Sequence, residues 1–252
     1  MSQYLYRYIS FETFVGMVQK QALTFVLPKV WDDPKERTAF YSFIGKRENI
    51  YERMMYLAIH GKTYAQCWTQ QEESDAMWRI YSYGNHAIRI KSSRGKIGQL
   101  EKVTAYDVKY VENPEEVGEK KNYFEALTQK RMAFEHEKEV RLINSYQFKT
   151  DEDFERHVKA LMIVSGHSGR VELLENLFPK LPLEEQVKEV ISLLNIGENS
   201  KNTKDISYAH INEFIEGVMV HPMAPTWYVE IVEEFCRKNS ILFEGKSVLY
   251  TE

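Results

Sequence analysis

The sequence has little cysteine and no long apolar run, and both absences narrow the cellular setting that we expect. Its 252 residues include two cysteines, Cys67 and Cys236, which are far apart and stand in no metal-ligand pattern. Such isolated cysteines are typical of reduced thiols in a cytosolic protein. No apolar stretch approaches the roughly 20 residues that span a bilayer, and the first ten residues lack the pattern of a signal peptide. We therefore expect a cytoplasmic protein that does not enter a membrane.

The sequence also lacks the common short motifs of nucleotide binding and hydrolysis. It contains no GxGxxG fingerprint and no GxxxxGK[ST] phosphate loop, and neither GxSxG nor HExxH occurs. The net charge of −4 gives no sign of a general polyanion-binding surface. An enzyme that binds a nucleotide without a glycine-rich loop stays open, as does a protein without catalytic activity.

What the sequence does contain is a globular composition, with 43% hydrophobic and 28% charged residues, in a chain long enough to bury a core. Apolar residues at every second position predict strands, and apolar residues spaced by 3.6 predict helices. The predicted strands are 4–10, 22–27, 63–69, 86–91, 102–111 and 214–222, followed by the short segments ILFEG and SVLY. The first predicted helix follows a capping Ser10, and the last follows a capping Thr226. The predicted helices between them span about 46–60, 74–84, 118–133, 151–164, 171–178 and 183–195.

Strands and helices do not alternate strictly along the chain, which favours an α+β fold. We expect a single domain, residues 1–252, with a helical insertion at about 150–205, because the strands after the insertion need partners before it. The Asp33-Pro34 pair predicts the start of a turn or loop. The polar stretch at 197–205 predicts an exposed loop.

The most unusual stretch is FEHEKEVRLI, residues 134–143, in which Glu135, Glu137 and Glu139 occupy every second position. As a strand, this stretch places side chains two positions apart on one face, about 6.5 to 7 Å from one another. Glu137, Glu139 and Arg141 then share a face, while Val140 and Leu142 point toward the core. Clustered acids raise the pKa of one another, and Arg141 partly offsets that effect.

Two other interpretations of the acidic stretch are open. It is also the pattern of a solvated edge strand whose charges prevent edge-to-edge pairing. Another interpretation is a metal site with two or three carboxylates, for which Asp32 and Asp33 are the further acids available.

Two further features contain candidate site residues. Arg7 lies in the tyrosine-rich strand YLYRYIS, where an exposed arginine stacked on tyrosine rings is the simpler interpretation. The segment CWTQQEESDAMWRIYSYG holds Trp68 and Thr69 at a strand end. In the same segment, core filling is the simpler role for Met77 and Trp78, and Tyr81 is better placed to face a ligand.

The motifs together resemble a bacterial domain-of-unknown-function family, number 2971 in that series. The matching segments, in order, are LYRYIS, LTFVLPKVWDDPKE, CWT, MWRIYSYGNHAIRI, VKYVE and FEHEKEVRLI. The resemblance covers about residues 4–143 and, more loosely, 214–250. It names no activity, and the segment at about 150–205 has no counterpart in it.

A second resemblance suggests an activity. An arginine on a first strand, a hydroxyl residue at a later strand end and glutamates on a strand after that are similar to the Arg–Ser/Thr–Glu arrangement of ADP-ribosyltransferases. This resemblance implies a mixed, mainly antiparallel sheet core and NAD as a substrate bound without GxGxxG. The chain departs from the pattern in having CWT where many of these enzymes have Ser-Thr-Ser, which weakens the assignment of Thr69.

The resemblance also implies roles for single residues. Glu139 would stabilise the oxocarbenium-like ribose and bond its 2′-hydroxyl, and Glu137 would orient or activate the acceptor. Arg7 would hold the diphosphate with its planar fork of donors. The remaining cofactor-binding residues would be Trp68 or Tyr81 stacking on nicotinamide, Thr69 supporting the first strand or the ribose, and Arg141.

The sequence thus predicts an ADP-ribosyltransferase or NAD glycohydrolase, with a bacterial toxin or anti-phage effector as its setting. The acceptor, protein or nucleic acid, is left open. A non-catalytic recognition module of a defence system, with the acidic strand as its partner surface, is the alternative from another class. A metal-dependent nuclease using Glu135, Glu137 and Glu139 with Asp33 is a third.

Overall fold

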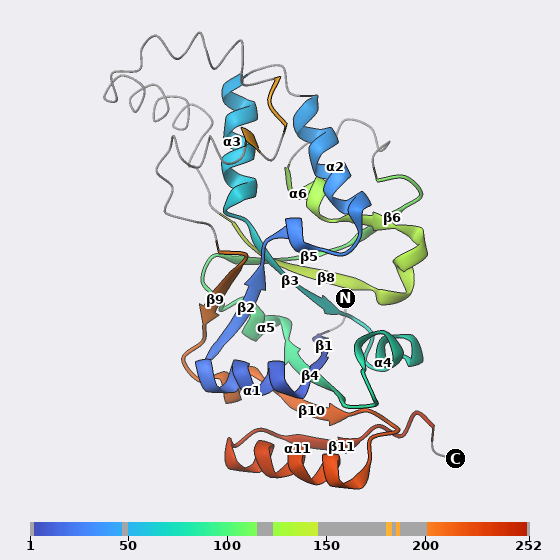
Figure 1. Ribbon diagram of the computed structural model, residues 1–252. Helices are drawn as coiled ribbons and strands as arrows, with labels where there is room; N and C mark the ends of the chain where they lie inside the picture. The colour runs from blue at the N-terminus through green and yellow to red at the C-terminus, as the bar shows by residue number, and fades with distance from the viewer. Residues whose placement is uncertain are drawn as a thin grey trace.

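The computed structural model of the chain describes residues 3–46, 50–114, 123–145, 180–182, 185–186 and 201–250. These residues form a mixed fold of several helices around an open, mainly antiparallel sheet (Figure 1). The predicted mixture of helices with a mainly antiparallel sheet is therefore confirmed. The helical insertion expected at about 150–205 falls almost entirely outside the described ranges, so it stays a prediction, as does the single-domain organisation.

Nine strands in the described ranges form the main sheet. Its hydrogen-bonded order is β11-β10-β4-β1-β3-β2-β9, and β8 pairs with β3 and in turn with β5. The described pairs are antiparallel except for β10 and β11, which run parallel. The strands are β1 (Tyr4–Ser10), β2 (Ala22–Val26), β3 (Tyr64–Thr69), β4 (Ala87–Ser93), β5 (Val103–Asp107), β8 (Glu139–Asn144), β9 (Thr203–Ser207), β10 (Gly217–Val220) and β11 (Phe243–Lys246).

Helices stand at two ends of this sheet, and others pack against its middle strands β1, β2 and β4. In Figure 1, α2, α3 and α6 stand together at the end formed by β8 and β5, and α11 lies at the other end beside β10 and β11. A small parallel sheet of β6 (Lys109–Val111) and β7 (Gln129–Arg131) adjoins α2 and α6. The helices are α1 (Phe11–Lys20), η1 (Pro28–Val30), α2 (Pro34–Gly45), α3 (Ile50–Gly61), α4 (Asp75–Tyr81), α5 (Arg94–Ile97), α6 (Tyr123–Leu127), η2 (Met132–Glu137), α10 (Ile211–Phe214) and α11 (Thr226–Lys238). Within the described ranges, no helix is long and apolar enough to cross a bilayer.

Local sequence signals explain several element boundaries. Ser10 caps α1 as predicted, because its hydroxyl accepts a hydrogen bond from the backbone nitrogen of Thr13. The turn predicted at Asp33-Pro34 is instead the start of α2. Proline suits the first turn of a helix, and Asp33 caps it by accepting from the backbone nitrogen of Lys35.

Other predicted boundaries were wrong. The strand predicted for 102–111 is divided at Val108 into β5 and β6, which belong to different sheets. The end of the polar stretch expected to be a loop forms the exposed edge strand β9, which pairs with β2. The helix predicted to follow a Thr226 cap begins at Thr226 itself, after Pro225. The segment SVLY is not a strand.

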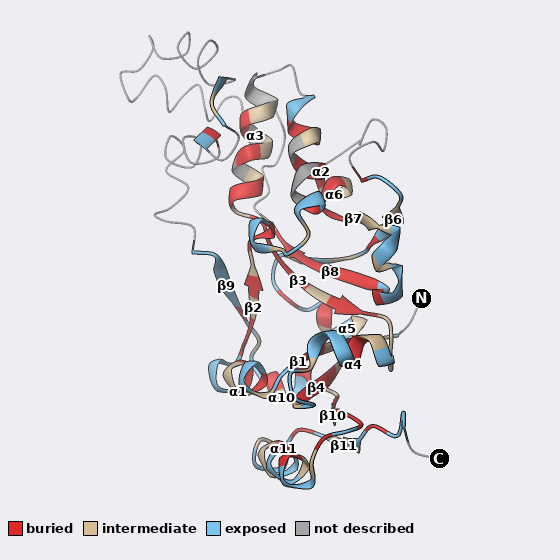
Figure 2. Ribbon diagram, turned by 45° about the vertical axis from the view of Figure 1, so that its right-hand side comes forward, coloured by how far each residue is buried: buried red, intermediate tan, exposed pale blue. Residues whose placement is uncertain are grey.

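Among the described residues, two groups of buried side chains join the sheet to α1, α4 and α11 (Figure 2). The larger one joins apolar residues of β1, β3, β4, β8 and β10 to α1 and α11. The smaller one contains Tyr8, Met77, Trp78 and Ala87, and its Tyr8 and Trp78 rings meet edge to face with centroids 4.7 Å apart. This smaller group fixes α4 on β1 and so determines where Tyr81, the last residue of α4, is placed.

The strands β1 and β2 diverge where they meet β3. β8 pairs with β3 along its whole length, from Tyr64 to Thr69. On the opposite edge of β3, β1 pairs only at Thr69 and β2 only at Ala65. The backbone around Cys67 therefore faces a gap between two strands, and this gap is where the candidate site lies.

Candidate active site

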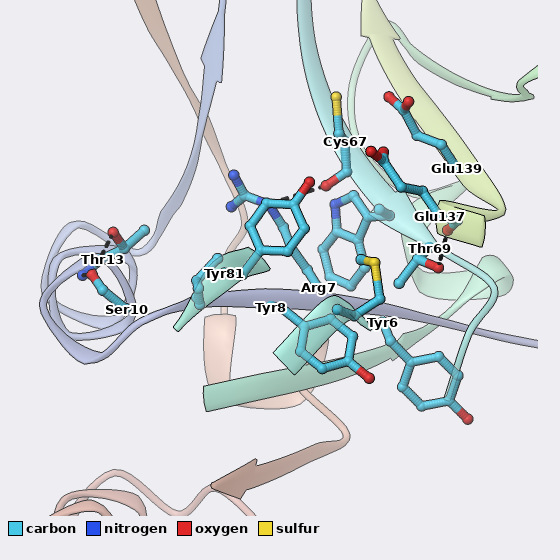
Figure 3. Close-up of a pocket in the computed structure, with 13 residues that line it drawn as sticks. Tyr6, Arg7, Tyr8, Ser10, Thr13, Cys67, Thr69, Tyr81, Glu137 and Glu139 are labelled. Carbon is cyan, nitrogen blue, oxygen red and sulfur yellow. Dashed lines mark hydrogen bonds between the residues drawn. The ribbon is translucent and has the colours of Figure 1, made fainter. Parts of the chain in front are cut away.

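A cavity of about 350 Å³ opens at the gap between β1 and β2 (Figure 3). Six of the seven site residues predicted from the sequence line it, although they come from five different elements. Its lining residues are Tyr6, Arg7, Tyr8, Ile9, Ser10, Thr13, Cys67, Trp68, Thr69, Met77, Tyr81, Glu137 and Glu139. The exception is Arg141, which is absent from this lining.

The acidic stretch is not one continuous strand. Glu137 ends the 3₁₀ helix η2, Lys138 has a positive φ of 40°, and β8 begins at Glu139. The prediction that Glu137 shares a strand face with Glu139 and Arg141 was therefore wrong. The tight turn at Lys138 nevertheless brings the two carboxylates side by side, and Figure 3 shows them together at one end of the cavity.

The acidic stretch is not a solvated edge either. β8 lies between β3 and β5, and every residue of it is buried. Glu139 is 3% exposed and Glu137 is 7% exposed. The edge-strand interpretation is wrong, because the charges of Glu137 and Glu139 are neutralised by the side chains of Lys130 and Arg141 and not by water.

Arg7 stands at the gap in the pairing of β3. Its Nε donates a hydrogen bond of 3.2 Å to the carbonyl oxygen of Cys67, which belongs to the stretch of backbone that neither β1 nor β2 covers. Within the described ranges, neither terminal nitrogen of Arg7 has a hydrogen-bond or ion-pair partner. Burial lowers the pKa of Arg7 from its ordinary value, yet an arginine stays protonated in proteins. Arg7 therefore offers the cavity a cation with available donors.

Thr69 is used by the protein itself. Its hydroxyl donates to the carbonyl oxygen of Glu137 and accepts a hydrogen bond of 2.9 Å from the backbone nitrogen of Gln71. Thr69 also pairs with Tyr6 of β1 and with Glu139 of β8. The residue therefore joins three parts of the site, and its hydroxyl fixes the turn that carries Glu137.

Glu139 is held from two directions. Arg141 donates to Oε1 from Nε at 2.8 Å and to Oε2 from Nη2 at 3.2 Å, and Lys130 donates to Oε2 at 3.0 Å. Burial favours the neutral acid, but Arg141 and Lys130 outweigh it and lower the pKa of Glu139 to about 2. Glu139 is therefore ionised, and both of its oxygens have partners.

Arg141 lies behind Glu139 and is 1% exposed. It donates to the carbonyl oxygen of Leu127 and, over 2.7 Å, to Oε2 of Glu36, and its guanidinium stacks over the ring of Trp31 at 4.1 Å. Although burial opposes the charge, Glu139 and Glu36 raise its pKa above the ordinary value. Its nitrogens are thus occupied, so Arg141 supports the site from behind the cavity wall.

Sequence reasoning missed Lys130 and Glu36. The ammonium of Lys130 lies 2.7 Å from Oε2 of Glu137, 3.0 Å from Oε2 of Glu139 and 3.7 Å from Oε1 of Glu36. Burial disfavours its charge, but the carboxylates, Glu139 first, raise the pKa of Lys130 above its ordinary value. We call Glu36, Lys130, Glu137, Glu139 and Arg141 the charged cluster, in which three carboxyl groups share two cations.

The two aromatic candidates differ in exposure. Trp68 is 2% exposed, belongs to the larger core, and donates its indole N–H to Oε1 of Gln66. Tyr81 is 42% exposed, and its ring stands between Arg7 and the two glutamates in Figure 3. Burial of the hydroxyl, followed by the charge of Glu137, raises the pKa of Tyr81. Of the two, Tyr81 is therefore the aromatic side chain that is exposed at the cavity, while Met77 and Trp78 fill the core as predicted.

The carboxylates proposed for a metal site do not converge. Asp33 pairs with Arg131, and Glu135 is exposed. In the part of the chain that the structure describes, no group of three or more His, Cys, Asp or Glu side chains is arranged to hold a metal ion. The two cysteines, Cys67 and Cys236, are free thiols.

Comparisons of the chain with protein-family models, with curated proteins and with solved structures found no match. Both family resemblances therefore rest on the residues and motifs of the sequence.

Proposed function

We propose that the cavity binds NAD and that the protein breaks the bond between nicotinamide and ribose, as an ADP-ribosyltransferase or an NAD glycohydrolase. One observation carries this proposal. One wall of the cavity has an arginine whose two terminal nitrogens have no partner among the described residues, and two buried carboxylates stand at one end. NAD has matching charges, because its diphosphate is anionic and its nicotinamide ring is cationic.

The size of the cavity determines which part of NAD it would enclose. Its volume of about 350 Å³ is near the lower end of the range for ligand sites, roughly 300 to 1,000 Å³. It is too small for the whole dinucleotide. We place the nicotinamide against Tyr81, the adjoining ribose at Glu137 and Glu139, and the diphosphate at Arg7 toward the opening, with the adenosine outside.

The reaction suits this arrangement of charges. The bond from ribose C1′ to the pyridinium nitrogen breaks, and its electron pair goes to that nitrogen, which leaves as neutral nicotinamide. The positive charge moves to C1′ and the ring oxygen of the ribose, where nearby carboxylates stabilise it in a water-poor site. Water or an acceptor then bonds to C1′ and gives up a proton, so the same site serves hydrolysis and transfer.

The contacts favour exchanging the roles that the sequence suggests for the two glutamates. Glu139 has both oxygens bonded, whereas Oε1 of Glu137 has no hydrogen-bond partner within the described ranges. We therefore propose that Glu137 contacts the ribose and that Glu139, anchored by Arg141, supplies a fixed negative charge behind it. Thr69 and Arg141 act through these two residues, and Trp68 supports the cavity wall from the core.

The alternative classes receive less support from these contacts. A recognition module that presents the acidic stretch to a partner needs exposed glutamates, and Glu137 and Glu139 are buried. A nuclease that uses the same acids needs them to gather around a metal ion, and they are paired with Lys130 and Arg141 instead. A toxin or an anti-phage effector stays the proposed setting, with the acceptor left open.

Labelled NAD tests the proposal. Purified protein is incubated with bacterial lysate and NAD labelled in the nicotinamide or in the adenylate, and free nicotinamide and labelled macromolecules are measured. We expect nicotinamide release from the wild type, a loss on the order of 100-fold in Glu137→Gln, and little change in Glu135→Gln, the matched exposed control. Absence of release and of transfer by the wild type would overturn the function. A folded Glu139→Gln that loses more than Glu137→Gln would overturn only the exchange of roles.

A further inference from the structure

Lys130 contacts carboxylates from three elements without lining the cavity. It stands on the short strand β7, and its side chain is 12% exposed. Its Nζ reaches Glu137 on η2, Glu139 on β8 and Glu36 on α2. The same Nζ lies 4.8 Å from the ring centre of Phe134, which covers it. A lysine carries a compact charge on a flexible stem, so packing of this kind fixes a charge that would otherwise move.

The two glutamates depend on Lys130 to different degrees. Without Lys130, Glu139 keeps its two hydrogen bonds from Arg141. The carboxylate of Glu137 has no other hydrogen-bond or ion-pair partner within the described ranges. Loss of the ammonium therefore leaves one carboxylate in place and releases the other, and the released one is the carboxylate with an oxygen open to the cavity.

Other charged and titratable groups also face Glu137 and Lys130. The negative or neutral ones cannot replace the ammonium, and Arg141 is fully occupied by Glu139, Glu36 and a backbone carbonyl. The groups in question are Glu36 on α2, Tyr81 on α4, Tyr110 on β6, and Glu139 and Arg141 on β8. Within the described ranges, Lys130 is therefore the cation that holds the carboxylate of Glu137.

We propose that Lys130 is a positioning residue that holds the carboxylate of Glu137 directed into the cavity, from behind the surface that meets the ligand. The effect on position follows from the contacts alone. Its value for catalysis rests on the proposed NAD reaction. A lysine at this point explains how two carboxylates can be buried side by side and still face a ligand, since like charges at this distance otherwise favour protonation of one of them.

The NMR signal of the Glu137 carboxyl group tests the proposal without NAD. Glutamate labelled with ¹³C at Cδ is observed at pH 7 in the wild type, Lys130→Met, Lys130→Arg and Lys109→Met. The last variant makes the same substitution at an exposed site of the neighbouring strand β6, and Glu137→Gln assigns the signal. We expect the Glu137 signal to move in Lys130→Met, because its hydrogen bond from Lys130 is lost, and to return toward the wild-type position in Lys130→Arg. An unchanged Glu137 signal in folded Lys130→Met would overturn the proposal.

A measurement on the wild type covers the case in which Lys130→Met does not fold. The Cε and Nζ resonances of Lys130 are followed through pH 10 to 11, where an ordinary lysine loses its proton. We expect no titration in that range, because the carboxylates hold the proton. An ordinary titration would show that the ammonium is not bound as the structure has it, and would overturn the proposal.

Kinetics then connect Lys130 to the proposed reaction. If the wild type releases nicotinamide, Lys130→Met should lower kcat on the order of 100-fold at pH 7, with KM little changed. Equal kcat in the two proteins would show that Lys130 does not contribute to catalysis. A wild type without activity would contradict the proposed function and would leave the NMR test of Lys130 unaffected.

Discussion

Two arginines on central strands lie on opposite sides of β3, and the protein treats them differently. Arg141 on β8 has every nitrogen bonded, stacks on Trp31, and has a raised pKa. Within the described ranges, Arg7 on β1 has one hydrogen bond, to a backbone carbonyl, and its pKa is lowered. The two arginines therefore differ in their terminal nitrogens, and this difference is the basis for proposing that Arg141 is structural and that Arg7 binds a ligand.

The largest effect should come from removing Arg141. The Arg141→Met variant leaves Glu36 and Glu139 buried beside one remaining cation, which should cost about 3–5 kcal/mol in the free energy of unfolding. Urea denaturation measures this. Arg237→Met is the matched control, because Arg237 also pairs with a glutamate, Glu234, but its side chain is 71% exposed. For this variant we expect a change below about 1 kcal/mol. Equal losses in the two variants would contradict the structural role of Arg141.

Acid should lower the free energy of unfolding by protonating Glu139, which Arg141 holds as a carboxylate. The pKa of Glu139 is about 2 in the folded protein against an ordinary 4.5, so the unfolded chain binds more protons between these values. The stabilisation is complete above about pH 4.5 and is lost as the pH falls toward 2, on the order of 3 kcal/mol. Urea denaturation from pH 7 to 2 should show a steeper acid loss in the wild type than in Glu139→Gln. Parallel curves would contradict the ion pair.

Thr69 of β3 pairs both with β1, which carries Arg7, and with β8, which carries Arg141. Substitution by valine removes its hydroxyl and keeps the shape of the side chain. Thr69→Val leaves the Glu137 carbonyl and the Gln71 N–H without their partner, which should cost about 1–3 kcal/mol. It should also lower nicotinamide release more than the loss of stability explains, because the turn carrying Glu137 is no longer fixed. Thermal unfolding and the NAD assay measure the two effects, and Thr203→Val on the exposed edge strand β9 is the control.

The smallest effect on stability should come from Arg7. Arg7→Met loses one hydrogen bond but also removes a half-buried charge that has no ion-pair partner among the described residues, so we expect a change within about 1 kcal/mol. The free energies of unfolding of Arg7→Met and Arg141→Met are measured under the same denaturing conditions and compared directly. A loss as large as that of Arg141→Met would show that Arg7 is structural.

The parts of this site that could be predicted from the sequence depend on local signals. Alternating residues in 4–10 and the capping Ser10 predict β1 and α1, and the spacing around Met77 and Trp78 predicts a helix with Tyr81 near its end. These signals involve neighbours in the chain. They are sufficient to place Arg7 and Tyr81 on their elements, although the pairing of β1 with β3 needed the three-dimensional structure.

Most of the charged cluster could not be predicted from local patterns. Glu36 and Arg141 are 105 residues apart. Lys130 is 7 residues from Glu137 and 9 from Glu139, but it lies on a strand of three residues that has no periodic pattern. Without these partners, three glutamates in a row are typical of an exposed edge. The structure shows a central strand instead, because Arg141 and Lys130 neutralise the acids that the sequence leaves unexplained.

Calorimetric titration with ADP-ribose tests the central claim most directly. ADP-ribose carries the diphosphate but lacks the nicotinamide bond, so it binds without being cleaved there. We predict binding by the wild type and by Arg237→Met, and an affinity about 10- to 100-fold lower in Arg7→Met, the loss expected for hydrogen bonds to a charged group. No binding by the wild type, or equal affinity in Arg7→Met, would contradict the claim that Arg7 is the ligand-binding arginine of the cavity.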